Sequence, residues 1–220
     1  MTAEQDVFDQ QKVAFTTKVS KTKYCRINAY KRCNDWKMFL VFVSFLYNIS
    51  LVVASILSIS VYKEVSLLNV AIAVLSVIVF AISLFASSLD FSRKANEYCR
   101  CYQALEEVLR EAGECKDETS LNRVKEKYNT IIDFSLNHEE CDYYRFMVEY
   151  PNGIESFRND DNGFKLSDDQ AKERCEKFNR DIRKKNSECN VRRTLLRTIL
   201  ALGPAYLIYL SIVALLRKKK

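Results

Sequence analysis

Two long apolar stretches lie close together in the first half of the chain, and neither contains a charged side chain. They cover residues 38–62 and 65–89, and only Lys63 and Glu64 separate them. Each is longer than the roughly 20 residues that a helix needs to cross about 30 Å of hydrocarbon. So short a connection turns the chain back on itself. The pattern therefore predicts an antiparallel transmembrane hairpin whose two flanks emerge on the same side.

The orientation of this hairpin follows from the lysines and arginines near the ends of the two spans. Both flanks are rich in cations, whereas the tip of the hairpin offers only Lys63. The positive-inside bias therefore predicts that both flanks are cytoplasmic and that the tip lies outside. The flanking cations are Lys18, Lys21, Lys23, Arg26, Lys31, Arg32 and Lys37 before the first span, and Arg93, Lys94 and Arg100 after the second.

Each predicted span carries one narrow stripe of polar residues on an otherwise apolar cylinder. Two interpretations remain open: the stripes pack helices against each other, or several hairpins assemble so that the stripes line a water-filled path. An asparagine is expensive to leave facing lipid, so it points at protein or water in either case. The stripes consist of Ser44, Asn48, Ser55 and Ser58 in the first span, and of Asn69, Ser76, Ser83 and Ser87 in the second.

The segment after the second span has helical periodicity. No Gly or Pro interrupts residues 90–112, so we expect the second span to continue as a helix through residues 91–114. A turn at residues 116–119 and a second amphipathic stretch over residues 120–149 complete an antiparallel helical hairpin under the membrane. The apolar stripe of the first of these helices is formed by Tyr98, Tyr102, Leu105 and Leu109.

The second of these helices carries the sequence SLNHEECDYY at residues 135–144. His138 and Asp142 are four residues apart, so the carboxylate could pair with the imidazole across one helical turn. A structural hydrogen bond, a pH-dependent or gating role, and metal or catalytic duty all remain open for the histidine. The segment offers neither a triad nor a metal shell, so we predict no catalytic residue and no metal site.

The C-terminal third begins with a loop at residues 150–164 and ends in a third apolar run. Ser167 and Gln170 form a predicted capping box at the start of a helix that reaches about Arg197. Residues 199–216 are uncharged and just long enough to span the membrane, with Gly203 and Pro204 expected to kink the helix. Because cations stand at both ends, a third membrane-embedded helix and a re-entrant or interfacial helix both remain open.

The expected fold is thus an all-α membrane protein. It comprises a transmembrane helical hairpin that continues into a cytoplasmic helical bundle, with a third, C-terminal membrane-embedded helix. The segments are 1–37 (cytoplasmic N-terminal segment), 38–89 (transmembrane hairpin), 90–149 (cytoplasmic helical hairpin), 150–197 (loop and C-terminal cytoplasmic helix) and 198–220 (apolar membrane helix with a basic tail).

Composition narrows the function. The net charge of +6 is uneven, because residues 111–190 carry 14 Lys and Arg against 19 Asp and Glu. Basic charge near the membrane and an acidic soluble part favour a lipid bilayer partner over nucleic acid. Four glycines without the spacing of a phosphate-binding loop predict no nucleotide cofactor. The eight cysteines all fall in predicted cytoplasmic segments, so we expect reduced thiols that act as small apolar residues.

These features together resemble the SLATT family, two-transmembrane effector domains of bacterial conflict systems. The resemblance covers about residues 18–144 and rests on the short-tipped hairpin, the helix after it, and the motif residues Asn137, His138, Asp142 and Tyr143. It implies a multi-pass protein of the bacterial inner membrane that assembles as a homo-oligomeric pore on an infection signal. It also implies a partner that senses infection or synthesises a messenger, or a nucleotide signal itself.

Two other classes of function stay open beside the pore. In the first, the hairpin anchors a scaffold that recruits a partner through its cytoplasmic helices, and the polar stripes are packing seams. The second is an enzyme, which the sequence disfavours because it contains no paired catalytic carboxylates, nucleophile motif or cofactor loop. The pore is the expected function, and the activating signal does not follow from the sequence.

Overall fold

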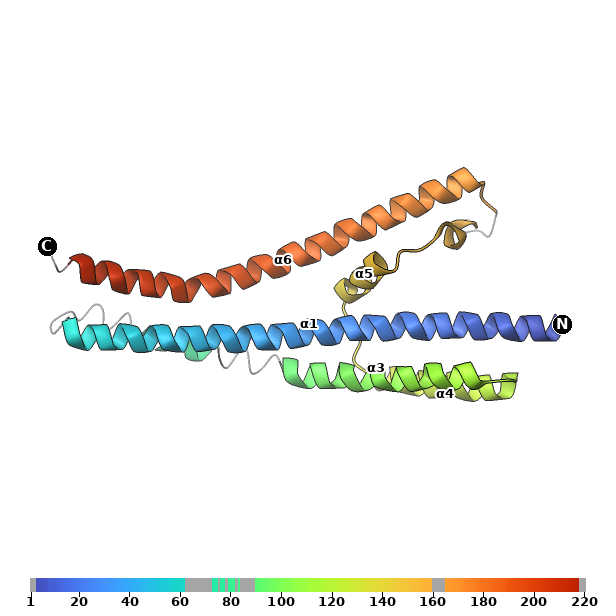
Figure 1. Cartoon of the computed structure of the whole chain (residues 1–220), viewed down its shortest axis with the longest axis horizontal. Helices are drawn as coiled ribbons and strands as arrows, with labels where there is room; N and C mark the ends of the chain where they lie inside the picture. The colour runs from blue at the N-terminus through green and yellow to red at the C-terminus, as the bar shows by residue number, and fades with distance from the viewer. Residues whose placement is uncertain are drawn as a thin grey trace. The chain divides into compact units, whose positions relative to one another are not determined.

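A computed structural model describes residues 3–61, 73–74, 76–77, 79–81, 83, 90–159 and 165–217. Over these ranges the chain is α-helical and forms no strand beyond one isolated bridge between Asn159 and Lys165. The expectation of an all-α protein is confirmed at this level. Figure 1 shows the helices α1 (Ala3–Val61), α3 (Phe91–Glu114), α4 (Glu118–Asp133), α5 (Glu140–Glu149) and α6 (Asp168–Arg217), with the 3₁₀ helix η1 (Ile154–Phe157).

The chain divides into two compact units. Unit 1 contains residues 1–33 and 93–190, and unit 2 contains residues 34–92 and 191–220. The three predicted apolar runs all fall in unit 2, whereas the polar flanks of the predicted hairpin fall together in unit 1. The apolar runs of the sequence therefore mark the same part of the chain that the folded contacts group as unit 2.

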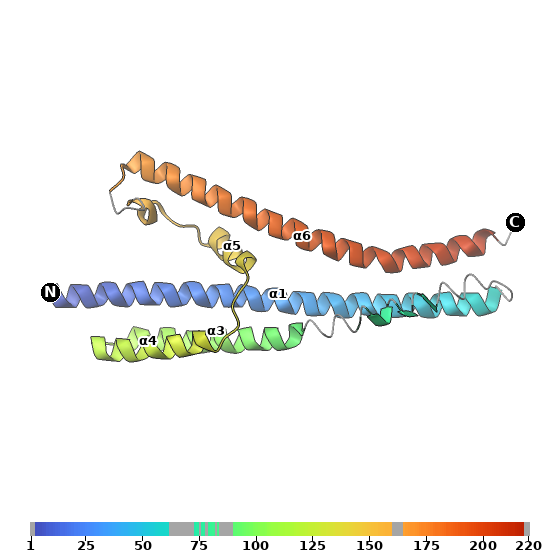
Figure 2. The same ribbon diagram turned by 180° about the vertical axis from the view of Figure 1, so that it is seen from behind.

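The core of unit 1 is built by α1, α3 and α4, which lie side by side in both views of the chain (Figures 1 and 2). Each helix presents one apolar face, as the periodicity of residues 91–114 predicts for α3. Burial of these faces is the main stabilising term. The core residues are Phe15, Val19, Cys101, Leu105, Val108, Ala112, Cys115, Leu121, Val124 and Tyr128.

The segment expected as one helix over residues 120–149 is two helices, so that prediction was wrong. Asp117 caps α4 by accepting a hydrogen bond from the Ser120 backbone N–H at 2.8 Å, and α4 ends at Asp133. α5 starts a new cap at Glu139, whose backbone N–H donates to the Asp142 carboxylate at 3.1 Å. The linker between the two helices contains neither Gly nor Pro, which is why the sequence did not reveal the break.

The expected continuation of the second span into residues 91–114 was also wrong at its start. α3 begins at Phe91, and Asp90 before it adopts a left-handed backbone with φ 49°. Aspartate is one of the few non-glycine residues that visit this region, because its short polar side chain can hydrogen-bond locally. The predicted end of the helix at Glu114 is confirmed.

α6 begins as predicted. The Gln170 backbone N–H donates to the Ser167 hydroxyl at 3.3 Å, and the Ser167 N–H donates to Gln170 Oε1 at 3.1 Å, which completes the capping box. Within unit 1 the helix buries only a thin seam formed by Ala171, Cys175 and Ile182. Pro204 lies inside this helix, which continues to Arg217. Figure 1 shows α6 as one continuous ribbon.

Unit 2 has its own packing seam on α1. Val43, Tyr47, Ser50 and Ala54 are buried at helical spacing, and Val79 packs with Val43 and Tyr47. Tyr47 also lies against Gly203 of α6 so closely that a Cβ at Gly203 would collide with the Tyr47 ring and hydroxyl. A small residue thus lets α6 approach α1 within this unit.

By length and composition, α1 is also the one described helix that could cross a membrane. Only 22% of its most apolar stretch is buried within the chain. The core helix of a soluble protein would bury most of such a stretch. The side chains that remain exposed include Val41, Phe42, Phe45, Ile49, Val52 and Ile56.

Candidate functional site

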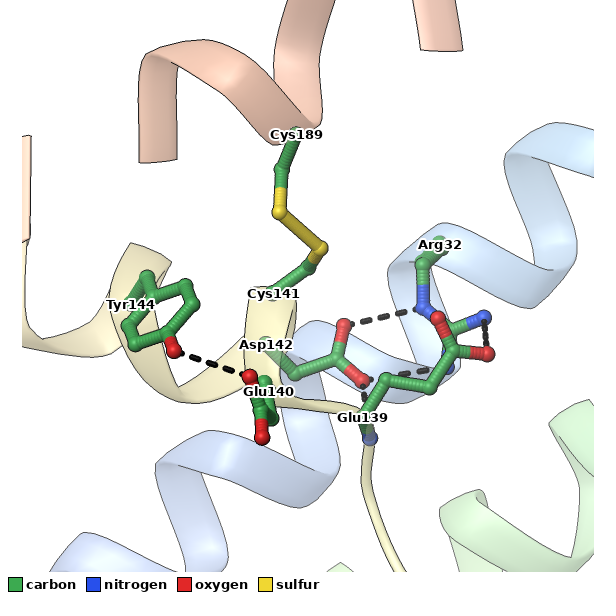
Figure 3. The surroundings of a disulfide bond; sticks show 7 residues. All are labelled: Arg32, Glu139, Glu140, Cys141, Asp142, Tyr144 and Cys189. Atoms are coloured by element: carbon green, nitrogen blue, oxygen red, sulfur yellow. Dashed lines mark hydrogen bonds and ion pairs between the residues drawn. A yellow bond between two sulfur atoms is a disulfide. The ribbon is translucent and has the colours of Figure 1, made fainter. Parts of the chain in front are cut away.

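A buried ion pair in unit 1 joins α1 to α5. Arg32 Nε and Nη2 donate to the two Asp142 carboxylate oxygens at 3.0 Å each, which is bidentate geometry. The two side chains are 8% and 2% exposed. Figure 3 shows Arg32 reaching from α1 toward the carboxylate at the start of α5. Removing either charge would leave the other buried and less well compensated, which is strongly destabilising.

Further hydrogen bonds hold the pair in place. Arg32 Nη1 donates to Glu139 Oε1 at 2.6 Å, and Glu139 is largely exposed. The buried Asn28 amide donates to the Asp142 backbone carbonyl at 3.2 Å. Asp142 itself accepts the Glu139 backbone N–H, as described above. The carboxylate that neutralises Arg32 is therefore also the N3 member of the capping box at the start of α5.

A second buried cation stands one and a half turns earlier on α1. Arg26 is 2% exposed, and its Nη1 lies 3.4 Å from His138 Nδ1 while Nη2 donates to Ser135 Oγ at 3.3 Å. Its Nε is buried without a hydrogen-bond partner. Both contacts come from the linker between α4 and α5. Two arginines of α1 thus hold this linker and the start of α5.

Electrostatics set the charge states around these arginines. Burial and the Arg26 cation lower the pKa of His138, although Asp142 opposes the shift. Burial alone would lower the pKa of Arg32, but the hydrogen bonds to Asp142 and the nearby carboxylates raise it. At neutral pH, His138 is therefore the uncharged neighbour of Arg26. The cationic form would place two like charges side by side.

The motif residues predicted from the sequence come together here, with one correction. His138 lies outside α5 and faces Arg26, so the predicted pairing of His138 with Asp142 across a helical turn was wrong. The Asn137 backbone carbonyl accepts a hydrogen bond from the buried Tyr98 hydroxyl at 2.7 Å. Tyr143 lies beneath the Lys21 ammonium, 5.0 Å from the ring centroid.

Sequence reasoning missed Arg26, Asn28 and Arg32, because the basic residues before the first span were taken only as topology signals. One signal was present. Arg26 follows Phe15 by 11 residues and Val19 by 7, so it shares their helical face. An arginine in register with core residues indicates a buried partner, and an acidic one is the usual choice.

A disulfide joins Cys141 of α5 to Cys189 of α6 next to this ion pair (Figure 3). The expectation that all eight cysteines are free thiols was wrong for this pair. The remaining six are free, and burial raises the pKa of Cys25 to about 11 and also raises that of Cys33. Such thiols stay protonated and unreactive at neutral pH.

In unit 2, a groove of about 660 Å³ collects three residues of the predicted polar stripes. Its lining includes Ser44 and Asn48 of α1 and Ser83, with Lys37 and Asp90 also part of the wall. Asn48 and Ser83 are exposed in the single chain, whereas Ser44 is partly buried. The buried seam described for unit 2 consists of other residues, so Asn48 and Ser83 are not part of it.

Three of the stripe residues, Asn48, Ser55 and Ser83, make hydrogen bonds to their own helix. Asn48 Nδ2 donates to the Ser44 carbonyl, and Ser55 and Ser83 donate to the carbonyls of Leu51 and Val79 four residues earlier. An amide has two N–H groups and an acceptor oxygen, so most of the capacity of Asn48 remains for water or another chain. Ser76 is exposed. The side chains of Ser58, Asn69 and Ser87 lie outside the described residues.

Comparison with known proteins identifies one family. A model of the SMODS and SLOG-associating 2TM effector domain family 5 matches residues 9–216. This match confirms the resemblance to the SLATT family and extends it over the loop, the third apolar run and α6 as far as residue 216. No curated protein and no solved structure matches the chain.

Proposed function

Because the chain belongs to the SMODS and SLOG-associating 2TM effector domain family 5, a membrane-associated effector family of conflict systems, we propose that it oligomerises into a pore in the bacterial inner membrane. The observation that carries this proposal is the groove of unit 2. Asn48 and Ser83 line it, are exposed in one chain, and take no part in its packing seam. In a bilayer they require polar neighbours, which a second copy or a water-filled path supplies.

The proposed topology is a hairpin of residues 38–62 and 65–89 with a third membrane-embedded helix at 199–216. It is supported by the gathering of all three runs in unit 2 and by the approach of α6 to Tyr47 at Gly203. Unit 1 then lies in the cytoplasm, as the flanking cations favour. No catalytic step, cofactor or nucleic acid is part of this proposal.

The proposed gate is the pair of arginines on α1. Arg26 and Arg32 belong to the same continuous helix as Ser44 and Asn48. A signal from a sensor protein, a messenger-synthesising partner or a nucleotide would act by separating α5 and its linker from these arginines. Loss of the Arg32–Asp142 pair would leave two buried charges, so α1 would have to rotate or move to rehydrate them. Such a movement would change the direction in which Ser44 and Asn48 of the α1 stripe point.

The test is dye release from liposomes that contain the purified full-length protein, together with its mass in detergent. We expect an oligomer that releases dye, and less release from the double variant Asn48→Leu and Ser83→Leu. The matched control is Val52→Leu with Val77→Leu, two exposed apolar positions of unit 2 whose change adds volume without removing a polar group. This control should release dye as the parent protein does.

Other results would redirect the proposal. Equal dye release by the Asn48/Ser83 variant and its control would show that the groove does not line a water-filled path. A monomer or dimer that never leaks would favour the second candidate, a membrane-anchored scaffold that recruits a partner through unit 1. The buried polar network would then fix a docking surface instead of a gate.

A further inference from the structure

The disulfide lies where it controls the attachment of α6 to the rest of unit 1. The core of unit 1 is made by α1, α3 and α4, and its cluster of buried residues includes none from α5 or α6. Of residues 168–190 in α6, only Ala171, Cys175 and Ile182 are buried. So thin a seam contributes little apolar burial. The covalent bond is therefore a large part of what fixes this half of α6.

Among the described residues, the loop before α6 provides an aromatic contact and an amide hydrogen bond to this half of the helix. Phe178 packs on Phe157 of η1 at 5.4 Å between ring centroids. Asn179 Nδ2 donates to the Asn152 carbonyl at 3.2 Å. Closer to the disulfide, Lys185 Nζ lies 5.3 Å from the Tyr144 ring centroid of α5. Segments held by so few buried contacts are the ones that open locally at low cost in free energy.

The disulfide also continues directly into the ion pair. Cys141 precedes Asp142, the carboxylate that neutralises Arg32 and belongs to the capping box of α5. A chain of contacts therefore runs from α6 through Cys189 and Cys141 to Asp142 and then to Arg32 of α1 (Figure 3). As long as the bond between the two sulfurs is intact, a displacement of α6 would be transmitted to Asp142.

Exposure and compartment decide whether this bond is permanent. Both bonded cysteines are partly exposed, whereas five of the six free cysteines are buried. A soluble thiol can therefore reach the disulfide but not most of the free thiols. The orientation of unit 1 toward the cytoplasm is part of the proposed function, and the present inference rests on it. Disulfides in that compartment are mostly transient, catalytic or redox-sensing.

We propose that Cys141 and Cys189 form a reversible redox tether, a thiol–disulfide exchange site whose reduction by a cellular dithiol releases the first half of α6 from α5. One thiolate of the dithiol attacks one sulfur of the pair, the bond between the two cysteines breaks, and the displaced cysteine leaves as a thiolate that takes up a proton. The second thiol of the dithiol then attacks the mixed disulfide. Two electrons pass to the two cysteines, and the dithiol becomes a cyclic disulfide.

The experiment uses the full-length protein in detergent or nanodiscs and does not depend on pore formation. The protein is equilibrated in glutathione buffers of increasing reducing strength, its thiols are trapped with a maleimide, and the labelled sites are identified by mass spectrometry. We expect Cys141 and Cys189 to become labelled together and reversibly. A pair that stays oxidised in the dithiol dithiothreitol, or never oxidises in oxidised glutathione, would overturn the proposal.

Hydrogen exchange of the same samples reports the structural consequence. Reduction should accelerate exchange at residues 168–190 at least tenfold and leave the α3–α4 core unchanged. Cys189→Ser should exchange quickly with or without dithiothreitol. Cys99→Ser, which removes a partly exposed free thiol, should keep the parental response to dithiothreitol. Equal exchange at residues 168–190 in oxidised and reduced parent protein would refute the tether, and this comparison needs no variant.

Dye release measured on the oxidised and reduced liposomes separates the two proposals. A redox-dependent change in exchange without any leakage would leave the tether standing and reject the pore. Leakage with no change in labelling or exchange would leave the pore standing and reject the tether.

Discussion

The Arg32–Asp142 pair should stabilise α5 through charge neutralisation deep inside unit 1, and the variant Asp142→Asn tests this. Asparagine keeps the shape of the side chain and an oxygen that can still accept the Glu139 backbone N–H. The substitution therefore removes the negative charge and largely preserves the cap. What remains is the buried Arg32 cation with one carboxylate, that of Glu139, within reach.

The magnitude follows from burial. Removing one partner of a buried ion pair typically costs about 3–5 kcal/mol, because the other charge stays desolvated. Glu139 still neutralises part of the Arg32 charge, but it is 62% exposed and water screens it. We therefore expect the lower end of the range, about 3 kcal/mol, which corresponds to roughly 150-fold faster exchange of the α5 amide hydrogens.

The assay is hydrogen exchange of the full-length protein in detergent, read by mass spectrometry at α5. The matched control is Glu107→Gln on α3, which also removes one carboxylate from an arginine. Its partner Arg110 is 59% exposed, so water solvates both groups and exchange around this position should hardly change. If Asp142→Asn accelerated α5 exchange no more than Glu107→Gln accelerates exchange in α3, the assignment of Arg32 and Asp142 as a buried latch would be wrong.

Two further predictions follow from the contacts of His138 and Gly203. Because the pKa of His138 is lowered in the folded protein, the unfolded chain takes up the proton first as the pH falls below about 6.5, and stability decreases by at most about 1.4 kcal/mol per pH unit. His138→Gln should lose that part of the pH dependence when unfolding midpoints are compared at pH 5.5 and 7.5, and equal slopes in the two proteins would contradict the assignment. Gly203→Ala places a Cβ against the buried Tyr47, so overpacking should destabilise unit 2 by about 1–3 kcal/mol in thermal unfolding. The control Ala201→Leu changes an exposed residue and should have little effect. An unchanged unfolding midpoint for Gly203→Ala would mean that α6 does not approach α1 at this residue.

Local patterns predicted the parts of the fold that depend on neighbours in the sequence. The apolar runs identify the residues of unit 2, and the Ser167–Gln170 capping box marks the start of α6. Both signals depend only on residues that are close together in the sequence, so no knowledge of distant contacts is needed to recognise them.

The contacts of the candidate site depend on packing between distant segments, and the sequence did not reveal them. Arg32 and Asp142 are 110 residues apart. The register of Arg26 with Phe15 and Val19 indicates a buried arginine, but no local pattern identifies the distant partner of either arginine. The disulfide likewise depends on where α6 lies against α5. The sequence did not reveal the break between α4 and α5 because the new capping box is made by Glu139 and Asp142. Both residue types also occur inside helices, so they do not mark a helix start.

The proposed gate would give the buried arginines a role beyond stability. A pair of well-packed apolar side chains would stabilise the contact between α1 and α5 at least as well as Arg32 and Asp142, without the cost of desolvating two charges. A charged contact has a property that an apolar one lacks: once parted, its members cannot stay where they are, because each is an isolated charge in an apolar environment. We therefore interpret the network as a two-state contact, closed when Asp142 lies against Arg32 and unstable at intermediate separations. Arg32 and the exposed Asn48 belong to the same helix, α1. In the proposed open state, a movement of α1 at Arg32 would therefore also move the proposed pore lining.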